Sequence, residues 1–117
     1  MTHKIMIIDD DPVIVTYLET LFGDNGYDTM SAVDGREAEE KVRQYRPDLI
    51  TLDLDMPREW GPRFYRNMTK DAALKDIPVI VVSGLSNPKH AIRNAVAVVR
   101  KPFDANALLA LVKKTIG

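Results

Sequence analysis

Acidic side chains directly follow two short apolar runs of the sequence. Asp9 and Asp10 come after the run 5–8, and Asp53 comes after the run 49–52. Continuous apolar runs of this length are typical of strands that are buried on both faces of a parallel sheet. The carboxyl ends of parallel strands share one edge, and ligands bind there where the strand order reverses. We therefore expect these three carboxylates to lie in one crevice.

Three carboxylates in one crevice require a cation. Like charges ~4 Å apart repel by about 4 kcal/mol at an effective dielectric constant near 20. The expected ligands are hard oxygen atoms, and the chain has no cysteine, so the donor set favours Mg²⁺. Because Mg²⁺ keeps several waters and accepts only one or two protein carboxylates plus a phosphate, one carboxylate is left to act as a nucleophile.

Two further strand ends supply a hydroxyl and an ammonium group. Ser83 follows the apolar run 79–82, and Lys101 comes shortly after the run 96–99. Phosphoryl transfer needs a nucleophile in line with the leaving group and positive charge around the equatorial oxygens. Attack by Asp53 would give an aspartyl-phosphate, with Mg²⁺ and Lys101 neutralising two oxygens and Ser83 donating to a third.

The positioning elements alternate along the chain. Strands are predicted at 5–8, 27–32, 49–52, 79–82 and 96–99. Helices are predicted from Pro12 to the glycines at 23 and 26, from Asp34 to Pro47, over about 63–71, as a short segment after Asn87-Pro88, and from Asp104 to the end. This alternation indicates an α/β fold, a flavodoxin-like doubly wound sheet of five parallel strands in the order 2-1-3-4-5, with helices on both faces and a shortened fourth helix.

Two local features are predicted from apolar spacing and from proline. The first helix is expected to bury one face made of Val13, Ile14, Tyr17, Leu18, Leu21 and Phe22. Pro62 is expected to delay the start of the third helix. Trp60 is interpreted as a half-covered aromatic residue of a loop.

Composition limits the class of protein. A chain of 117 residues fits a single domain, 1–117, with no output domain in this chain. Its 16 basic and 17 acidic residues give a net charge of −1, which argues against nucleic acid or a membrane surface as a partner held by charge. No signal peptide and no apolar stretch of membrane-spanning length occurs, so a cytoplasmic location is expected.

Several motifs follow one another along the whole chain. They are Asp9–Pro12, Pro47–Pro57, Gly61, Pro78–Gly84 and Lys101–Phe103. Each of them alone is common in turns and at strand ends. Their order, spacing and placement together resemble the receiver domain of two-component response regulators.

The resemblance implies a metal site and a phosphorylation site. Asp53 would be the phospho-acceptor, and the carboxylates of Asp10 and Asp53 would bind Mg²⁺. The backbone carbonyl of Asp55 would be the third protein ligand, and Asp9 would act through a metal-bound water. A receiver domain is not a turnover enzyme, but it catalyses its own phosphorylation and dephosphorylation.

The resemblance also implies roles for the other two strand ends. Ser83 would be the switch hydroxyl, and Lys101 the phosphate partner, aimed by a cis Lys101–Pro102 peptide. The phosphoryl donor would be a sensor histidine kinase or a histidine phosphotransfer protein. A homodimer or a downstream protein would be contacted through the fourth helix, strand five and the last helix.

Departures from the family pattern leave two alternatives open. The segment between Ser83 and Lys101 is about one helical turn (~4 residues) shorter than the pattern, and Val98 stands where an aromatic residue is usual. These features would suit a pseudo-receiver, a protein-binding module that is not phosphorylated. Asp53-Leu54-Asp55 is also a D-x-D motif, as found in haloacid-dehalogenase-like phosphohydrolases, and it adds an acidic side chain beside the site.

Overall fold

The computed structural model of the chain describes residues 2–84 and 95–117. A single sheet contains the five parallel strands β1 (Lys4–Ile8), β2 (Asp28–Ala32), β3 (Leu49–Leu52), β4 (Val79–Ser83) and β5 (Ala97–Arg100). Their order across the sheet is β2-β1-β3-β4-β5. The predicted strand order is therefore confirmed, with β1 and β3 adjacent at the point where the order reverses.

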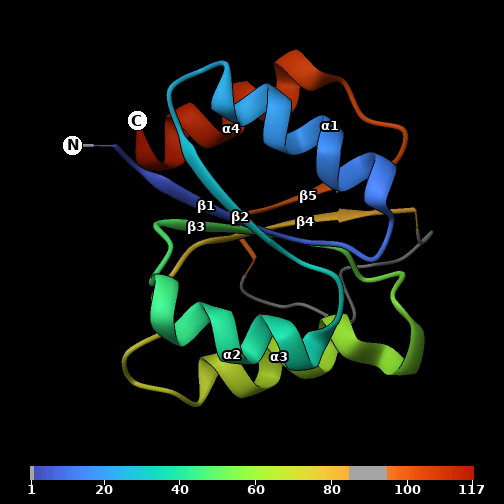
Figure 1. The fold of residues 1–117 in the computed structure, drawn as a ribbon, viewed down its shortest axis with the longest axis vertical. Coiled ribbons are helices and arrows are strands. Elements are labelled where there is room, and N and C mark those ends of the chain that lie inside the picture. Colours follow the sequence, from blue (N-terminus) through green and yellow to red (C-terminus); the bar gives the residue numbers. More distant parts are fainter. Residues whose placement is uncertain (1, 85–94) are drawn as a thin grey trace.

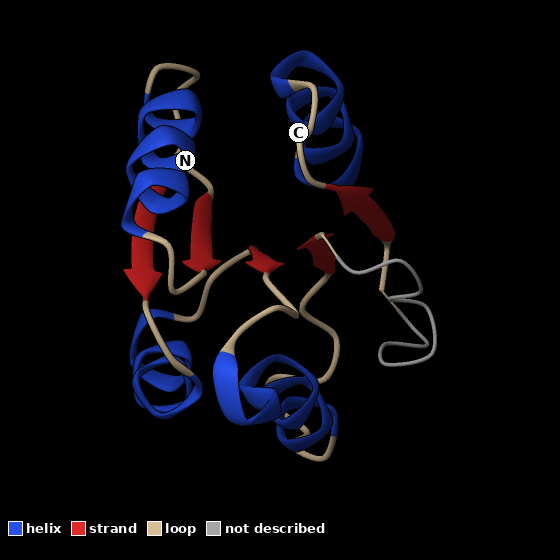
Figure 2. Ribbon diagram, turned by 90° about the vertical axis from the view of Figure 1, so that its right-hand side faces the viewer, coloured by secondary structure: helices blue, strands red, loops and turns tan. Residues whose placement is uncertain are grey.

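Helices cover both faces of the sheet (Figures 1 and 2). They are α1 (Pro12–Gly23), α2 (Gly35–Tyr45), α3 (Trp60–Thr69) and α4 (Ala105–Ile116), and a 3-10 turn, η1 (Pro57–Glu59), precedes α3. Figure 1 shows α1 and α4 on one face and α2 and α3 on the other. The short helix predicted after Asn87-Pro88 lies outside the described residues. Within the described ranges, no helix is long and apolar enough to cross a membrane.

Side chains alternate between two cores because successive residues of a strand point to opposite faces of the sheet. Ile5 and Ile7 of β1 belong to the core under α1 and α4. Met6 and Ile8 belong to the core under α2 and α3. Strands β1, β3 and β4 are buried almost throughout, which explains their continuous apolar sequences.

Aspartates begin three of the helices, as the sequence predicts. The side chain of Asp11 accepts a hydrogen bond from the amide of Val13 at 2.9 Å, and Asp34 accepts one from the amide of Glu37 at 2.8 Å. Asp104 caps α4 in the same way. Each such cap stabilises the fold by about 1 kcal/mol, and the cap at Asp11 fixes where the loop after β1 ends.

The predicted inner face of α1 is wrong at two positions. Val13 is 73% exposed and Tyr17 is 48% exposed, whereas the buried residues of α1 are Val15, Leu18 and Phe22. Positions 15, 18 and 22 follow helical spacing and form one narrow stripe toward the sheet. Val13 and Tyr17 are one turn apart on an adjacent stripe, so they form an apolar surface rather than core.

Pro62 does not delay α3, contrary to expectation. The helix begins at Trp60, and Pro62 lies in its first turn, where a missing amide hydrogen costs no helical hydrogen bond. Trp60 is half-buried and packs against the core on the α2 and α3 side. A Cβ atom at Gly35 would overlap the Trp60 ring, so the absence of a side chain at the start of α2 lets the two helix starts meet.

Candidate functional site

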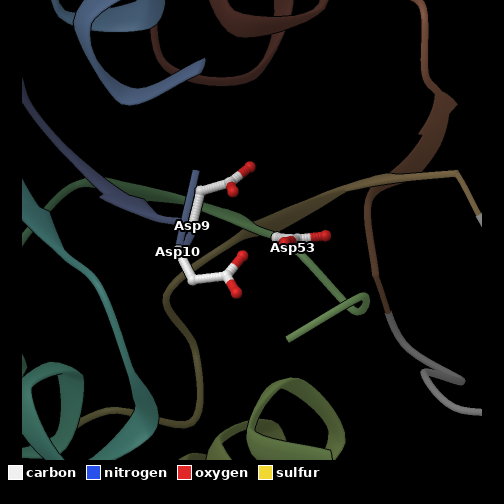
Figure 3. Close-up of side chains that lie close together, drawn as sticks. All are labelled: Asp9, Asp10 and Asp53. Atoms are coloured by element: carbon white, nitrogen blue, oxygen red, sulfur yellow. The ribbon is translucent and has the colours of Figure 1, made fainter. Parts of the chain in front are cut away.

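Three carboxylates meet at the carboxyl edge of the sheet, as the sequence predicts. Asp9 and Asp10 follow β1, and Asp53 follows β3, the strand next to β1 in the sheet. Each side chain offers one oxygen, and these oxygens all lie within 4.8 Å of one another. Figure 3 shows the three carboxylates pointing to the same side of the strand ends.

Lys101 joins this cluster from the end of β5. Its Nζ lies 3.1 Å from Asp9 Oδ2 and 3.3 Å from Asp53 Oδ1. The Lys101–Pro102 peptide is cis, as expected, and the amide of Lys101 donates to the carbonyl of Ser83 at 3.0 Å. Burial acts against the charged ammonium, but the hydrogen bond to Asp9 and the charges of Asp53 and Asp9 outweigh it and raise the pKa of Lys101.

Burial distinguishes the acids of the cluster. Asp9 and Asp53 are 3% and 1% exposed, whereas Asp10 is exposed. Burial raises the pKa of Asp53 from its ordinary 3.8 to about 6, and the charges of Asp9 and Asp55 add to the rise. The hydrogen bond from the Asp55 amide and the charge of Lys101 oppose it. Asp53 is therefore a carboxylate whose negative charge needs further compensation.

The two described partners of the Asp53 side chain use the same oxygen. Asp53 Oδ1 accepts a hydrogen bond from the amide of Asp55 at 2.9 Å and faces the ammonium of Lys101. Among the described residues, neither partner occupies Oδ2. The contacts to Oδ1 fix the orientation of the carboxylate. Oδ2 can then act as a metal ligand or as a nucleophile.

Ser83 lies at the end of β4, next to β3, and is fully buried. Its Oγ donates a hydrogen bond to Asp55 Oδ1 at 3.0 Å. The amide of Gly84 donates to Asp55 Oδ2 at 2.8 Å. The Asp55 side chain therefore ties the loop after β3 to the end of β4, a contact that the sequence analysis did not predict.

A glycine allows the backbone to close tightly beside Asp53. A Cβ atom at Gly61 would lie 2.6 Å from the Asp53 carbonyl oxygen and 3.0 Å from the Cα of Leu54. Both are backbone atoms, which cannot move away without displacing the end of β3. Gly61, named above only as part of a motif, thus keeps the first turn of α3 against the residue at the centre of the site.

The donor set of this crevice fits a magnesium ion. The three clustered side chains supply hard oxygen ligands, and two of these carboxylates are buried beside a single described ammonium group. A divalent cation would relieve the remaining repulsion between the acids.

Comparison with known proteins places the chain in a family. The model of the response regulator receiver domain matches residues 5–113. The fold and the acidic edge thus belong to the receiver class, and the chain is a member of the response regulator receiver domain family. Receiver domains are signalling switches rather than turnover enzymes, and they generally bind Mg²⁺ in an acidic pocket. In this chain Asp9, Asp10 and Asp53 form an acidic cluster.

Individual relatives agree with this assignment. Protein Rrf1 of Nitratidesulfovibrio vulgaris is 40% identical over 117 residues, which cover 100% of this chain and 85% of Rrf1. The DNA-binding dual master transcriptional regulator RpaA of Synechocystis is 35% identical over 114 residues, covering 94% of this chain but only 47% of RpaA. The structure of chemotaxis response regulator CheY4 of Vibrio cholerae matches with a TM-score of 0.90 at 27% identity, covering 99% of this chain and 100% of that chain.

Proposed function

We propose that Asp53 accepts a phosphoryl group from a phosphohistidine in a Mg²⁺-dependent reaction, and that residues 1–117 act as one cytoplasmic receiver domain. The observation that carries this proposal is the position of the buried Asp53 carboxylate, which shares one crevice with Asp9, Asp10 and the Lys101 ammonium. Receiver domains interact with histidine kinases or phosphotransfer proteins and with downstream effectors. A sensor histidine kinase or a histidine phosphotransfer protein is accordingly the proposed donor.

The chain's own residues perform most of the transfer. Asp10 and Asp53 would hold Mg²⁺ through their carboxylates, Asp55 through its backbone carbonyl and Asp9 through a water; the ion supplies positive charge for the phosphoryl oxygens. A carboxylate oxygen of Asp53 forms the new bond to phosphorus while the bond from phosphorus to the donor's imidazole nitrogen breaks. The imidazole leaves with the electron pair, so no strong general base is needed.

Lys101 follows the charge during this step. Its ammonium is shared between Asp53 and Asp9 before transfer and offsets part of their negative charge. Once Asp53 is esterified, that carboxylate has lost its charge, and the phosphoryl group brings about −1.5 to −2 charges to the same place. Lys101 can then contact a phosphoryl oxygen with little movement, because its ammonium already lies beside Asp53.

Ser83 is the proposed sensor of the new group. Moving a two-state ensemble from 1:99 to 99:1 takes about 5.5 kcal/mol of differential contact. Hydrogen bonds to charged groups contribute roughly 1.5–3 kcal/mol each, so Ser83 and Lys101 together approach the requirement. The proposed output surface comprises the segment after Asn87-Pro88, which lies outside the described residues, together with β5 and α4. We propose that it binds a second copy of the chain or a downstream protein rather than nucleic acid or a membrane.

The exposed apolar part of α1 is the proposed contact for the donor protein. Val13, Ile14 and Tyr17 line an open groove together with the segment Lys101–Phe103. The rings of Tyr17 and Phe103 meet edge to face with their centroids 5.9 Å apart. Because Lys101 belongs both to this groove and to the site, a protein that delivers a phosphoryl group to Asp53 would cover the groove.

Intact mass spectrometry after incubation with acetyl phosphate and Mg²⁺ tests the proposal. The wild type should gain one phosphoryl group, and removal of Mg²⁺ or the substitution Asp53→Asn should abolish the gain. Asp24→Asn, at the exposed far end of α1, is the matched control and should still be modified. Failure of folded wild type to gain mass would favour a pseudo-receiver, and steady Mg²⁺-dependent hydrolysis of a generic phosphomonoester would favour a phosphohydrolase.

A further inference from the structure

The side chain of Asp55 holds the two donors at the end of β4. Its Oδ1 accepts the hydrogen bond of the Ser83 hydroxyl at 3.0 Å, and its Oδ2 accepts that of the Gly84 amide at 2.8 Å. A carboxylate that accepts from two adjacent donors with its two oxygens uses them as two oxygens of a phosphoryl group would. Both donors therefore contact the Asp55 carboxylate before any phosphoryl group arrives.

The same carboxylate is fixed relative to the phospho-acceptor. The amide of Asp55 donates to Asp53 Oδ1 at 2.9 Å, so the loop that carries the Asp55 side chain is anchored on Asp53 itself. Gly84 contributes by its small size, since a Cβ atom there would lie 3.2 Å from Asp55 Oδ2. A side chain at position 84 would therefore crowd the Asp55 carboxylate and shift it by a few tenths of an ångström.

We propose that the Asp55 carboxylate is an internal latch, which binds the Ser83 hydroxyl and the Gly84 amide in the unphosphorylated state and competes for them with a phosphoryl group on Asp53. This inference rests on the function proposed above. Asp55 is here a positioning residue, because it acts on the switch through Ser83 and Gly84 rather than through the reacting atoms.

With the latch present, phosphorylation exchanges one set of hydrogen bonds for another instead of only adding hydrogen bonds. Two hydrogen bonds to a carboxylate are lost when two hydrogen bonds to the phosphoryl group form. The net free energy from Ser83 is therefore smaller than the free energy of one new charged hydrogen bond. The negative charge of Asp55 also repels the phosphoryl group, and this separate effect must be measured apart from the latch.

Two neutralising substitutions separate these effects. Asp55→Asn keeps the size of the side chain but replaces one carboxylate oxygen by an NH₂ group. Only one oxygen is then left to accept, so the hydrogen bonds from Ser83 and Gly84 are weakened. Asp11→Asn removes one charge from the loop that follows Asp10 and keeps the helix cap, because asparagine caps as well as aspartate. Asp11 makes no described hydrogen bond to Ser83 or Gly84, so this variant reports charge without the latch.

The test measures the affinity of Mg²⁺-loaded protein for beryllofluoride, a phosphoryl mimic, by calorimetry. Asp55→Asn should bind about tenfold more tightly than wild type, the equivalent of one charged hydrogen bond no longer displaced. In the Ser83→Ala background the same substitution should give a clearly smaller gain. Hydrogen exchange of the Gly84 amide without ligand should be faster in Asp55→Asn than in wild type.

The outcomes distinguish the latch from the function on which it rests. Unchanged or weaker binding by Asp55→Asn would overturn the latch, and so would an equal gain from Asp11→Asn or an equal gain with and without Ser83. If neither the wild type nor any variant binds beryllofluoride while Gly84 exchange still responds to Asp55, the proposed phospho-acceptor function fails instead, and the competition with it.

Discussion

The ammonium of Lys101 lies 3.3 Å from Asp53 Oδ1, although the two residues end strands that are separated in the sheet by β4. This ion pair spans the edge of three strands and is continued by the contact of Lys101 with Asp9. It keeps positive charge beside Asp53 before a phosphoryl group is present. The same ammonium therefore contributes both to the stability of the site and to its charge balance.

Replacement of Lys101 by methionine should destabilise the protein in a pH-dependent manner. The substitution leaves Asp9 and Asp53 buried without their shared ammonium. We expect a loss of about 1–3 kcal/mol in the free energy of unfolding at pH 7.5. The loss should be smaller at pH 5, where Asp53 is largely protonated. Urea unfolding at both pH values, with Lys101→Arg as the charge-retaining control, measures this; an equal loss at both would contradict it.

Ionisation of Asp53 should lower stability in the absence of divalent cations. The folded pKa of about 6 lies above the ordinary 3.8, so the folded protein binds a proton that the unfolded chain has released between these values. Stability should therefore fall as the pH rises from about 4 to about 6, and stay lower above it. Asp53→Asn should remove this fall and be more stable than wild type at pH 7.5, by on the order of 2 kcal/mol.

Thermal unfolding across this pH range, in buffer with a chelator, measures the effect. Adding Mg²⁺ should stabilise the wild type at pH 7.5 by mass action and should have little effect on Asp53→Asn. A wild-type stability that rises between pH 4 and 6 more steeply than that of the variant would contradict the assignment of the raised pKa to Asp53.

Substitution of Gly61 should damage the site through the backbone. The added methyl group of Gly61→Ala would lie 2.6 Å from the Asp53 carbonyl oxygen, so the first turn of α3 must move away from β3. We expect a loss of about 1–3 kcal/mol in the free energy of unfolding and weaker Mg²⁺ binding. Gly23→Ala is the matched control, because a Cβ there meets nothing within 4 Å; it should be neutral or slightly stabilising. Equal effects of both would contradict the close-approach argument.

The exposed tyrosine of α1 should matter for a protein donor but not for a small one. Tyr17→Ala removes an aromatic side chain that is 48% exposed beside Phe103. We expect transfer from a phosphorylated histidine kinase or phosphotransfer protein to slow about tenfold, as for the loss of one aromatic interface contact. Phosphorylation by acetyl phosphate should be unchanged, as should both rates in Thr20→Ala. A parallel loss with both donors would place Tyr17 in the fold rather than in docking.

Much of this fold could be predicted because its strands and helix starts are marked by short local sequence patterns. The apolar runs before Asp9 and Asp53 are buried strands, and Asp11, Asp34 and Asp104 begin helices as their capping chemistry requires. The predicted strand order brings these carboxylates and Lys101 to one edge of the sheet. Both the sheet order and this convergence are present in the structure.

The remaining features depend on packing that no local pattern contains. Val13 and Tyr17 fit an apolar stripe, but the sheet covers only the narrower stripe through Leu18. The contact between Asp55 and Ser83 joins side chains from two neighbouring strand ends, and its existence depends on the conformation of the loop after β3. A D-x-D motif beside a strand that ends in Ser-Gly is the signal by which such a contact could be sought.

Locating the modified residue shows whether Asp53 carries the phosphoryl group. Protein treated with acetyl phosphate and Mg²⁺ would be reduced with borohydride, which converts an acyl phosphate to the alcohol, and then digested and mapped by tandem mass spectrometry. We expect homoserine at position 53 and unmodified aspartate at positions 9, 10 and 55. Reduction at any of those three positions, with position 53 intact, would contradict it.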